Sequence, residues 1–229
     1  MMKPESMRVV VADDHAVVRE GIRHVLERVE GPEVVAEAGD GDEALALVNQ
    51  HEPDLLVLDI TMPGRSGLDV TRTLRRAENG LGILILSMHD DPEYVLEAVR
   101  TGADGYVLKD ADPAELRAAV VAVYEGREYL SERVTVQLSK AVRAELEQQQ
   151  RKSRIDMLTP REKEVLLEVA TGRTSREIGE LLGISPRTVE THRERVMSKL
   201  RIRTIAGLTR FVVETGLTGP DLPPEEGSN

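Results

Sequence analysis

The 229-residue sequence predicts an α/β fold, a doubly wound (βα)5 domain with a parallel five-stranded sheet, followed by a small all-α domain of four helices. Over residues 1–130, short apolar runs alternate with amphipathic stretches, which is the pattern of repeated βα units. After Thr159 the apolar residues recur only at helical spacing. The charge changes too: residues 1–130 carry 13 Lys and Arg against 26 Asp and Glu, whereas residues 151–217 carry 14 against 9. We therefore expect two units with different partners, the second suited to a polyanion.

The first domain is expected over residues 7–128, with five strands and a helix after each. Its apolar runs predict strands at residues 8–14, 33–38, 54–60, 82–88 and 105–109. The intervening stretches predict helices at residues 15–29, 42–51, 68–77, 92–101 and 113–125. Pro92 and Pro113 each follow an aspartate, a combination that marks a helix start, and Gly102 stands where the fourth helix should end. Five such units predict helices on both faces of the sheet.

The remainder is expected to be helical. Residues 129–156 predict a helix that frays into a polar linker, because residues 148–153 have nothing to bury. Residues 157–217 predict four short helices at 160–171, 175–182, 186–200 and 205–215. Gly183 and the Ser185-Pro186 pair make a tight turn between the second and third, which indicates a helix-turn-helix unit. Residues 218–229 have a composition typical of a disordered tail.

The composition excludes several classes of protein. The absence of cysteine rules out disulfides and thiolate metal sites. No stretch approaches the ~20 apolar residues that a membrane-spanning helix needs. The first six residues lack the apolar segment of a signal peptide. We therefore expect a soluble, cytoplasmic protein with no membrane partner.

Charged side chains follow three of the predicted strands. Asp59 ends the apolar run of the third strand, the pair Asp13-Asp14 ends that of the first, and Lys109 ends that of the fifth. The carboxyl ends of parallel strands meet at one edge of a sheet, which is where such folds place their chemistry. The sequence therefore predicts one rim with three carboxylates and one ammonium. His15 is expected to open the first helix instead of joining the chemistry.

This combination of groups favours phosphoryl chemistry. Clustered carboxylates repel one another unless a cation lies among them, and oxygen ligands suit Mg²⁺. Asp59 is the candidate nucleophile, and Asp13 and Asp14 would hold the metal directly or through water. Lys109 would pair with the phosphoryl oxygens, and the hydroxyl of Ser87, at the end of the fourth strand, could donate to them.

The third helix of the second unit carries candidate contacts to DNA. A helix that enters the major groove needs short donors and acceptors near its N-terminus, with cations beside them for phosphates. The residues of this helix that can supply both are Arg187, Thr188, Glu190, Thr191, Arg193, Arg195 and Lys199. An amphipathic bundle with an ordinary charged surface would give a similar pattern, so the pattern alone is a weak signal.

Four motifs of the first unit resemble a known family. They are Ala12-Asp13-Asp14-His15, Leu58-Asp59-Ile60-Thr61-Met62-Pro63-Gly64, Leu86-Ser87-Met88 and Gly105-Tyr106-Val107-Leu108-Lys109. In this combination, residues 8–125 resemble the receiver domain of bacterial response regulators. The resemblance implies that Asp59 takes a phosphoryl group from a partner histidine kinase.

The same resemblance assigns further roles. It implies that Mg²⁺ is held by Asp14, Asp59 and the backbone carbonyl of Thr61, with Asp13 acting through water. Ser87 and Tyr106 match the family's switch pair, in which the hydroxyl moves toward the phosphate and the aromatic ring rotates inward. Such a change is a new charge that orders a bistable packed element.

The second unit resembles the DNA-binding domain of the NarL/FixJ (LuxR-type) regulators. The resemblance rests on Leu158-Thr159-Pro160-Arg161-Glu162, on the run from Ile178 to Ser185 and on Thr188-Val189-Glu190-Thr191-His192-Arg193. It implies a sequence-specific transcription factor that binds double-stranded DNA through its third helix. The last helix, with Ile205, Leu208 and Val212, would help to form a homodimer that phosphorylation favours.

Two other functions stay open at this point. One is a Mg²⁺-dependent aspartyl phosphatase of the haloacid-dehalogenase type, which needs an aspartate two residues after the nucleophile, where this chain has Thr61. We therefore expect no enzyme beyond phosphoryl transfer to Asp59 and its dephosphorylation. The other is a DNA-binding regulator whose first half is a phosphorylation-independent scaffold. DNA binding that Asp59→Asn leaves unchanged would favour the scaffold.

Overall fold

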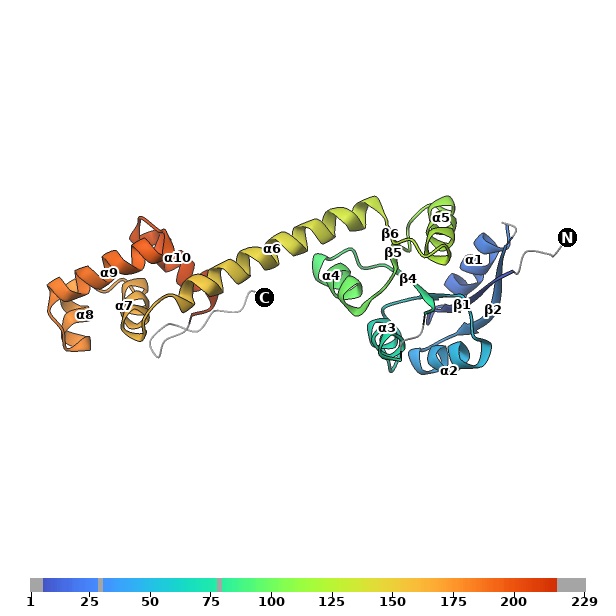
Figure 1. Ribbon diagram of the computed structural model, residues 1–229, viewed down its shortest axis with the longest axis horizontal. Helices are drawn as coiled ribbons and strands as arrows, with labels where there is room; N and C mark the ends of the chain where they lie inside the picture. The colour runs from blue at the N-terminus through green and yellow to red at the C-terminus, as the bar shows by residue number, and fades with distance from the viewer. Residues whose placement is uncertain (1–5, 29–30, 78–79, 218–229) are drawn as a thin grey trace. The chain divides into compact units, whose positions relative to one another are not determined.

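The computed structural model describes residues 6–28, 31–77 and 80–217 of the chain, which divides into two compact units, Met1–Val142 and Arg143–Asn229. Figure 1 labels most of the helices and strands of both units. The predicted disordered tail, residues 218–229, lies outside the described residues.

The first unit is a parallel sheet between helices. Its strands are β1 (Met7–Ala12), β2 (Pro32–Ala38), β3 (Leu55–Leu58), β4 (Gly82–Ser87), β5 (Gly105–Leu108) and β6 (Tyr129–Leu130). They lie in the order β2-β1-β3-β4-β5-β6, and every neighbouring pair is parallel. The helices are α1 (Ala16–Leu26), α2 (Gly41–His51), α3 (Gly67–Arg76), α4 (Pro92–Thr101) and α5 (Pro113–Tyr124). The predicted parallel α/β architecture is confirmed, with six strands among the described residues where the sequence predicted five.

Two apolar cores cover the two faces of this sheet. Alternate residues of a strand point to opposite faces, so Leu56 and Leu58 of β3 join one core while Leu55 and Val57 join the other. The first core receives side chains from α2, α3 and α4, and the second from α1 and α5. Figure 1 shows α1 and α5 on one side of the sheet and α2 and α3 on the other. Only the strand ends are left for polar chemistry.

The sixth strand leads directly into the long helix α6 (Glu132–Asp156). Two residues are too few to show a strand periodicity, which is why the sequence did not reveal β6. The structure also differs from the expected fraying at residues 148–153, because α6 stays helical to Asp156. Arg151 lies 3.8 Å from Glu147, one turn earlier, and 3.4 Å from Glu214, and Gln, Arg and Lys are good helix formers.

The second unit contains the helices α7 (Pro160–Ala170), α8 (Ser175–Leu182), α9 (Pro186–Leu200) and α10 (Ile205–Thr215). Thr159 and Thr174 begin α7 and α8 with capping boxes, and the Ser185 hydroxyl accepts from the N–H of Thr188 at the start of α9. Gly183 ends α8 with a φ of 66°, which glycine adopts without strain. A side chain at Gly179 would meet the Ile184 carbonyl oxygen at 2.7 Å, so glycine also permits the tight turn between α8 and α9.

Candidate functional site

Main-chain contacts fix the carboxylates at the strand ends. Asp59 follows β3, and its N–H donates to the carbonyl of Ala12 at 2.8 Å, while the N–H of Asp13 donates to the carbonyl of Ala38 at 3.1 Å. A side chain at Gly67 would lie 2.0 Å from the Asp59 carbonyl oxygen, so only glycine lets α3 approach the site this closely. The backbone thus brings Asp13 and Asp59 to one rim, as the sequence predicted.

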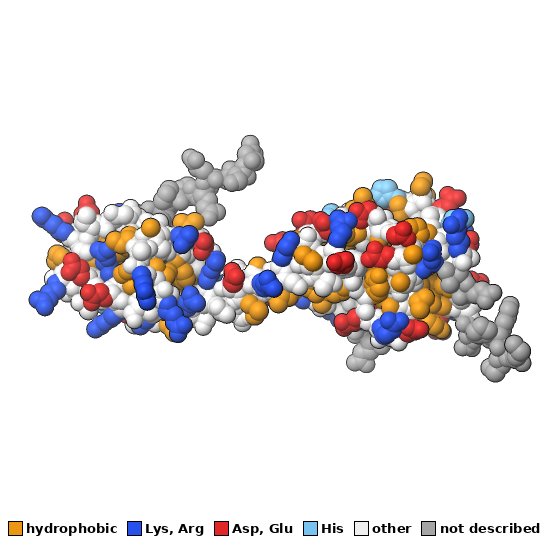
Figure 2. All heavy atoms as spheres, turned by 90° about the horizontal axis from the view of Figure 1, so that it is seen from above, with side chains coloured by type: hydrophobic (Ala, Val, Ile, Leu, Met, Phe, Trp, Pro, Cys, Tyr) orange, Lys and Arg blue, Asp and Glu red, His pale blue; other side chains and the backbone are white. Residues whose placement is uncertain are grey.

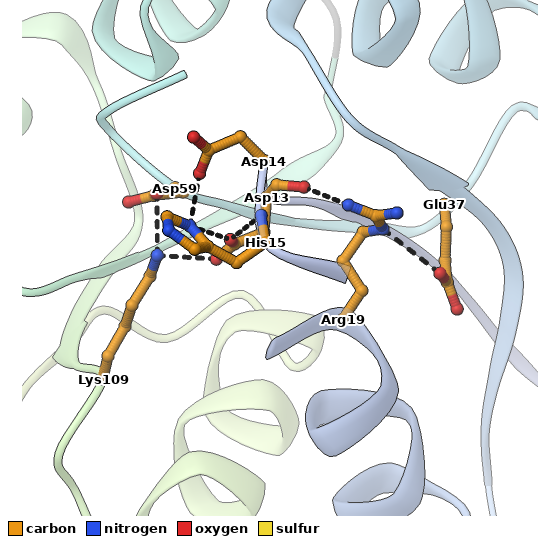
Figure 3. Close-up of polar contacts among 7 residues, drawn as sticks. All are labelled: Asp13, Asp14, His15, Arg19, Glu37, Asp59 and Lys109. Carbon is orange, nitrogen blue, oxygen red and sulfur yellow. Dashed lines mark hydrogen bonds and ion pairs between the residues drawn. The ribbon is translucent and has the colours of Figure 1, made fainter. Parts of the chain in front are cut away.

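One ammonium serves two buried carboxylates. Lys109 Nζ lies 2.7 Å from Asp59 Oδ2 and 2.7 Å from Asp13 Oδ2, and Figure 3 shows it reaching between them. Asp13 is 1% exposed and Asp59 is 4% exposed. Asp13 Oδ2 has no hydrogen-bond partner among the described residues, where this ion pair is its one polar contact. With Asp14 beside them, the rim holds more negative than positive charge.

The charges of the rim shift one another's pKa. Burial raises the pKa of Asp59, the charge of Asp13 adds to the rise, and the hydrogen bond from Lys109 only partly opposes it. Burial lowers the pKa of Lys109, but its close contacts with the carboxylates of Asp13 and Asp59 outweigh this and raise it overall. The carboxylate at position 59 is therefore held in an environment that disfavours its charge.

The side chain of His15 contacts the carboxylates of the rim, although it was expected only to begin the first helix. It begins α1, as predicted, although its side chain makes no capping hydrogen bond. Its Nδ1 lies 2.6 Å from Asp14 Oδ1 and 3.4 Å from Asp13 Oδ1. Ligand atoms of Asp13, Asp14 and His15 lie within 4.8 Å of one another, a grouping that does not include Asp59. The sequence could have indicated this contact, because His15 directly follows Asp13 and Asp14. The residue that begins a helix lies next to the end of the preceding strand.

The rim fits a hard divalent cation. Its carboxylates supply oxygen ligands, its negative charge exceeds that of the one ammonium, and Asp13 Oδ2 has unused acceptor capacity. Thr61 lies in the same loop, two residues after Asp59, and its hydroxyl lies 3.0 Å from His89 Nε2. The carboxylates that could hold a metal at this rim are therefore those of Asp13, Asp14 and Asp59.

The two residues predicted to form a switch pair are both buried. Ser87, at the end of β4, is fully buried, and Tyr106 of β5 is 1% exposed, so its ring already lies inward. The Tyr106 hydroxyl donates to the carbonyl of His89 at 2.6 Å, and the N–H of His89 donates to Ser87 Oγ at 3.1 Å. Burial raises the pKa of Tyr106 to about 12, and the charge of Asp59 adds to this, so the hydroxyl stays a donor at neutral pH.

In the second unit, α9 presents part of the predicted DNA face. Its exposed candidates are Arg187, Thr188, Glu190, Thr191 and Arg195. Figure 2 shows Lys and Arg side chains over much of the visible face of this unit, interspersed with acidic ones. Four of the five, all but Arg195, lie in the N-terminal half of α9, which is therefore accessible to a ligand.

The structure places Arg193 and Lys199 elsewhere. Arg193 is half-buried and donates to Ser175 Oγ at 2.8 Å, which ties α9 to α8. Lys199 Nζ lies 2.6 Å from the buried carboxylate of Glu162 and 3.1 Å from the Met157 carbonyl oxygen. Both cations hold α9 within its own unit.

The residues predicted for dimer contact are divided by the structure. Leu208 is fully buried and Val212 is 1% exposed, so both belong to the core of the second unit and present no surface to a partner. Ile205 is 47% exposed, and Val213, which the sequence reasoning missed, is 59% exposed. The spacing of Ile205, Thr209 and Val213 places them on one helical face, a signal that was available.

Comparisons with known proteins agree with this geometry. Residues 9–121 match the family model of the response regulator receiver domain, and residues 156–212 match that of the bacterial regulatory proteins of the luxR family. Among the described residues, no helix has the length and apolar character needed to cross a membrane.

Several relatives are similar along nearly their whole length. The oxygen regulatory protein NreC of Staphylococcus epidermidis is 38% identical, over 92% of this chain and 99% of the relative. The nitrate/nitrite response regulator protein NarP of Escherichia coli is 38% identical, over 94% and 99%.

Solved structures show the same likeness. The response regulator ChrA of a heme-sensing two-component system has a TM-score of 0.54 at 36% identity, covering 93% of this chain and 99% of that one. The response regulator RcsB in complex with DNA has a TM-score of 0.55 at 28% identity, covering 92% and 99%. The chain therefore belongs to the NarL/FixJ-type response regulators, which join a receiver domain to a LuxR-type DNA-binding domain.

Proposed function

We propose that Asp59 accepts a phosphoryl group from a partner histidine kinase, and that this modification raises the affinity of the protein for double-stranded DNA. The observation that supports this most directly is the buried Asp59 carboxylate at the end of β3, held by the ammonium that also holds Asp13. The raised pKa means that the surroundings of Asp59 destabilise its ionised carboxylate. Phosphorylation removes this charge from the carboxylate and places negative charge on phosphoryl oxygens, which several groups can stabilise.

Each residue of the rim has a role in this transfer. An oxygen of Asp59 forms a bond to phosphorus as the bond between phosphorus and the kinase histidine breaks. The Lys109 ammonium moves from the carboxylates to the phosphoryl oxygens, and the Ser87 hydroxyl donates to them. Asp14, Asp59 and the Thr61 carbonyl would hold Mg²⁺, with Asp13 acting through water. When bound, Mg²⁺ supplies positive charge that offsets the charge arriving on the phosphoryl group.

The second unit reads DNA in this proposal. Thr188, Glu190 and Thr191 meet base edges or phosphates in the major groove, while Arg187 and Arg195 neutralise phosphates on either side. Their exposure on α9 supports this assignment, and the relative RcsB has a solved structure in complex with DNA. Arg193 and Lys199 act indirectly, because they hold α9 against its neighbours.

Binding to DNA involves a homodimer that phosphorylation favours. Two joined copies gain effective concentration on paired half-sites without new base contacts. The exposed face of α10 that contains Ile205 and Val213 is the proposed contact in this unit. A related structure contains two RcsB dimers on two parallel DNAs. The protein acts in the cytoplasm, and it catalyses only its own phosphorylation and dephosphorylation.

Intact mass measured with a small phosphodonor and Mg²⁺ tests the assignment of Asp59. We expect the native chain to gain one phosphoryl group and the Asp59→Asn chain to gain none, and chelation of Mg²⁺ to abolish the gain. A purified histidine kinase serves as a second donor. Equal labelling of both chains would contradict the assignment, and failure of both donors on the native chain would favour the scaffold. Sustained turnover of a small phosphoester would instead favour the phosphatase.

A further inference from the structure

Helix α6 begins in contact with the proposed switch tyrosine. The N–H of Ser131, the residue before α6, donates to the Tyr106 carbonyl at 3.2 Å, and Leu130 of β6 pairs with Tyr106 in the sheet. The N–H of Thr135 donates to the Ser131 carbonyl at 2.9 Å, and Val134 is fully buried in the core of the first unit. The backbone of Tyr106 is thus bound to the point where α6 starts.

The other end of Tyr106 reaches α6 by a second route. Its hydroxyl donates to the carbonyl of His89, and the next residue, Asp90, has its Oδ2 3.2 Å from Arg133 Nη2. Arg133 Nη1 also donates to Asp110 Oδ2 at 2.8 Å. Since Arg133 is the second residue of α6, the contacts close into a ring of Tyr106, His89, Asp90, Arg133 and Ser131, which we call the switch ring.

His89 joins the switch ring to the loop of the phosphoacceptor. Its Nε2 lies 3.0 Å from Thr61 Oγ1, and its imidazole stacks on Tyr94 with ring centroids 4.4 Å apart. Thr61 lies two residues after Asp59 in the same loop. The switch ring is thus in contact with the loop of Asp59 through Thr61, and with the end of β4 through Ser87, which accepts from the His89 N–H.

We propose that the switch ring carries the phosphorylation state of Asp59 to α6, with Arg133 as its positioning residue. The inference rests on the proposed function. When the Ser87 hydroxyl turns to the phosphoryl group, the loop with His89 and Asp90 follows, and Arg133 changes from sharing Asp90 and Asp110 to pairing with Asp110 alone. These two arrangements of one guanidinium are the bistable element that allosteric coupling needs. The start of α6 responds because β6 and the buried Val134 attach it to the first unit.

A merely structural role for Arg133 makes a different prediction. Its side chain is 59% exposed, and exposed ion pairs contribute little to stability. Its replacement should therefore leave folding and phosphorylation almost unchanged in either case. Only a coupling role changes the ratio of DNA affinities between the phosphorylated and unphosphorylated states.

The test compares Arg133→Gln with Arg127→Gln in the full chain. Arg127 is a matched control, because it is an exposed arginine of the same unit whose described ion pair is with Glu125 alone. Phosphoryl incorporation is measured first by intact mass. DNA affinity is then measured at fixed salt, with a duplex selected from a random pool by the phosphorylated native protein.

For the native chain and Arg127→Gln we expect phosphorylation to tighten binding about tenfold, and for Arg133→Gln less than about threefold, at equal incorporation. Asp90→Asn should behave like Arg133→Gln, and the double variant should add nothing. A native ratio in Arg133→Gln, with full incorporation, overturns the coupling and leaves the proposed function intact. If the native chain incorporates no phosphoryl group, the proposed function fails and this inference fails with it.

Discussion

Two lysines in two regions of this molecule look alike in sequence and differ in what they do. Lys109 in the first unit and Lys199 in the second were both expected to meet a phosphate, and each lies beside a buried carboxylate. Lys109 is shared by Asp13 and Asp59, whereas Lys199 meets one acid, Glu162. The Glu162 carboxylate also accepts from the N–H of Thr159 at 2.8 Å.

The difference lies in how completely each carboxylate is satisfied. Asp13 Oδ2 makes no hydrogen bond among the described residues, and Asp14 adds charge that no lysine balances. Burial raises the pKa of Glu162, but Lys199 and the cap at Thr159 outweigh this and lower it overall. A buried ion pair marks a reactive site where negative charge is in excess, and a structural contact where the charges balance.

Removing each lysine should separate the two roles. Lys109→Met should slow phosphoryl transfer to Asp59 by about 100-fold or more, because one preorganised charge at a transition state contributes this much. Lys199→Met should transfer at the native rate. The rate of phosphoryl incorporation from a small phosphodonor measures both effects. A Lys109→Met rate within threefold of the native rate would contradict the catalytic role of Lys109.

The second lysine should matter for folding instead. Lys199→Met leaves the Glu162 carboxylate buried without its cation, which should cost the second unit about 3 kcal/mol. Hydrogen exchange of the core amides of α7 and α9 reports this unit separately in the full chain. Native protection in Lys199→Met would show that Lys199 is free to serve DNA.

The dependence of stability on pH should have opposite signs in the two regions. The folded pKa of Glu162 lies below its ordinary 4.5, so its stabilising contribution is complete above pH 4.5 and is lost as the pH falls through the folded pKa. The folded pKa of Asp59 lies above its ordinary 3.8, so ionised Asp59 destabilises the first unit at neutral pH, and this penalty disappears as the pH falls.

Asp59→Asn should therefore stabilise the first unit by roughly 1 kcal/mol at neutral pH, as expected where a residue is kept for reactivity. Glu162→Gln should destabilise the second unit. Denaturant unfolding at pH 7 and pH 4, followed by exchange of each unit's core amides, measures both signs. Destabilisation by both replacements would contradict the account.

The smallest effect concerns DNA. Arg195→Gln should reduce the slope of log affinity against log salt concentration by about 1, because an exposed arginine at a phosphate releases about one counterion. Lys199→Met, measured under conditions where it stays folded, should leave the slope unchanged. The reverse result would exchange the roles of the two residues.

The positions of the charged residues at the strand ends were predictable, because the buried runs beside them can form only interior strands. Apolar runs such as Leu55 to Leu58 must form interior strands, so the charged residues that follow them must meet at the rim. The helices of the second unit were predictable from their caps and from glycine at the turn. These features depend on local sequence.

The rest depends on contacts distant in sequence. No local pattern shows that Lys199 pairs with Glu162, 37 residues away. Strand β6 has two residues, and it forms by pairing with β5, where Tyr106 is the partner of Leu130. It is also where the switch ring closes, so the element that the sequence concealed is the one that joins the site to α6.

The most direct test of the central claim is DNA affinity at fixed salt for the native and Asp59→Asn chains, each with and without a phosphodonor and Mg²⁺. The account predicts that the donor tightens binding and promotes dimers in the native chain alone. Equal tightening of both chains, or no change in a native chain shown by mass to carry the phosphoryl group, would contradict it.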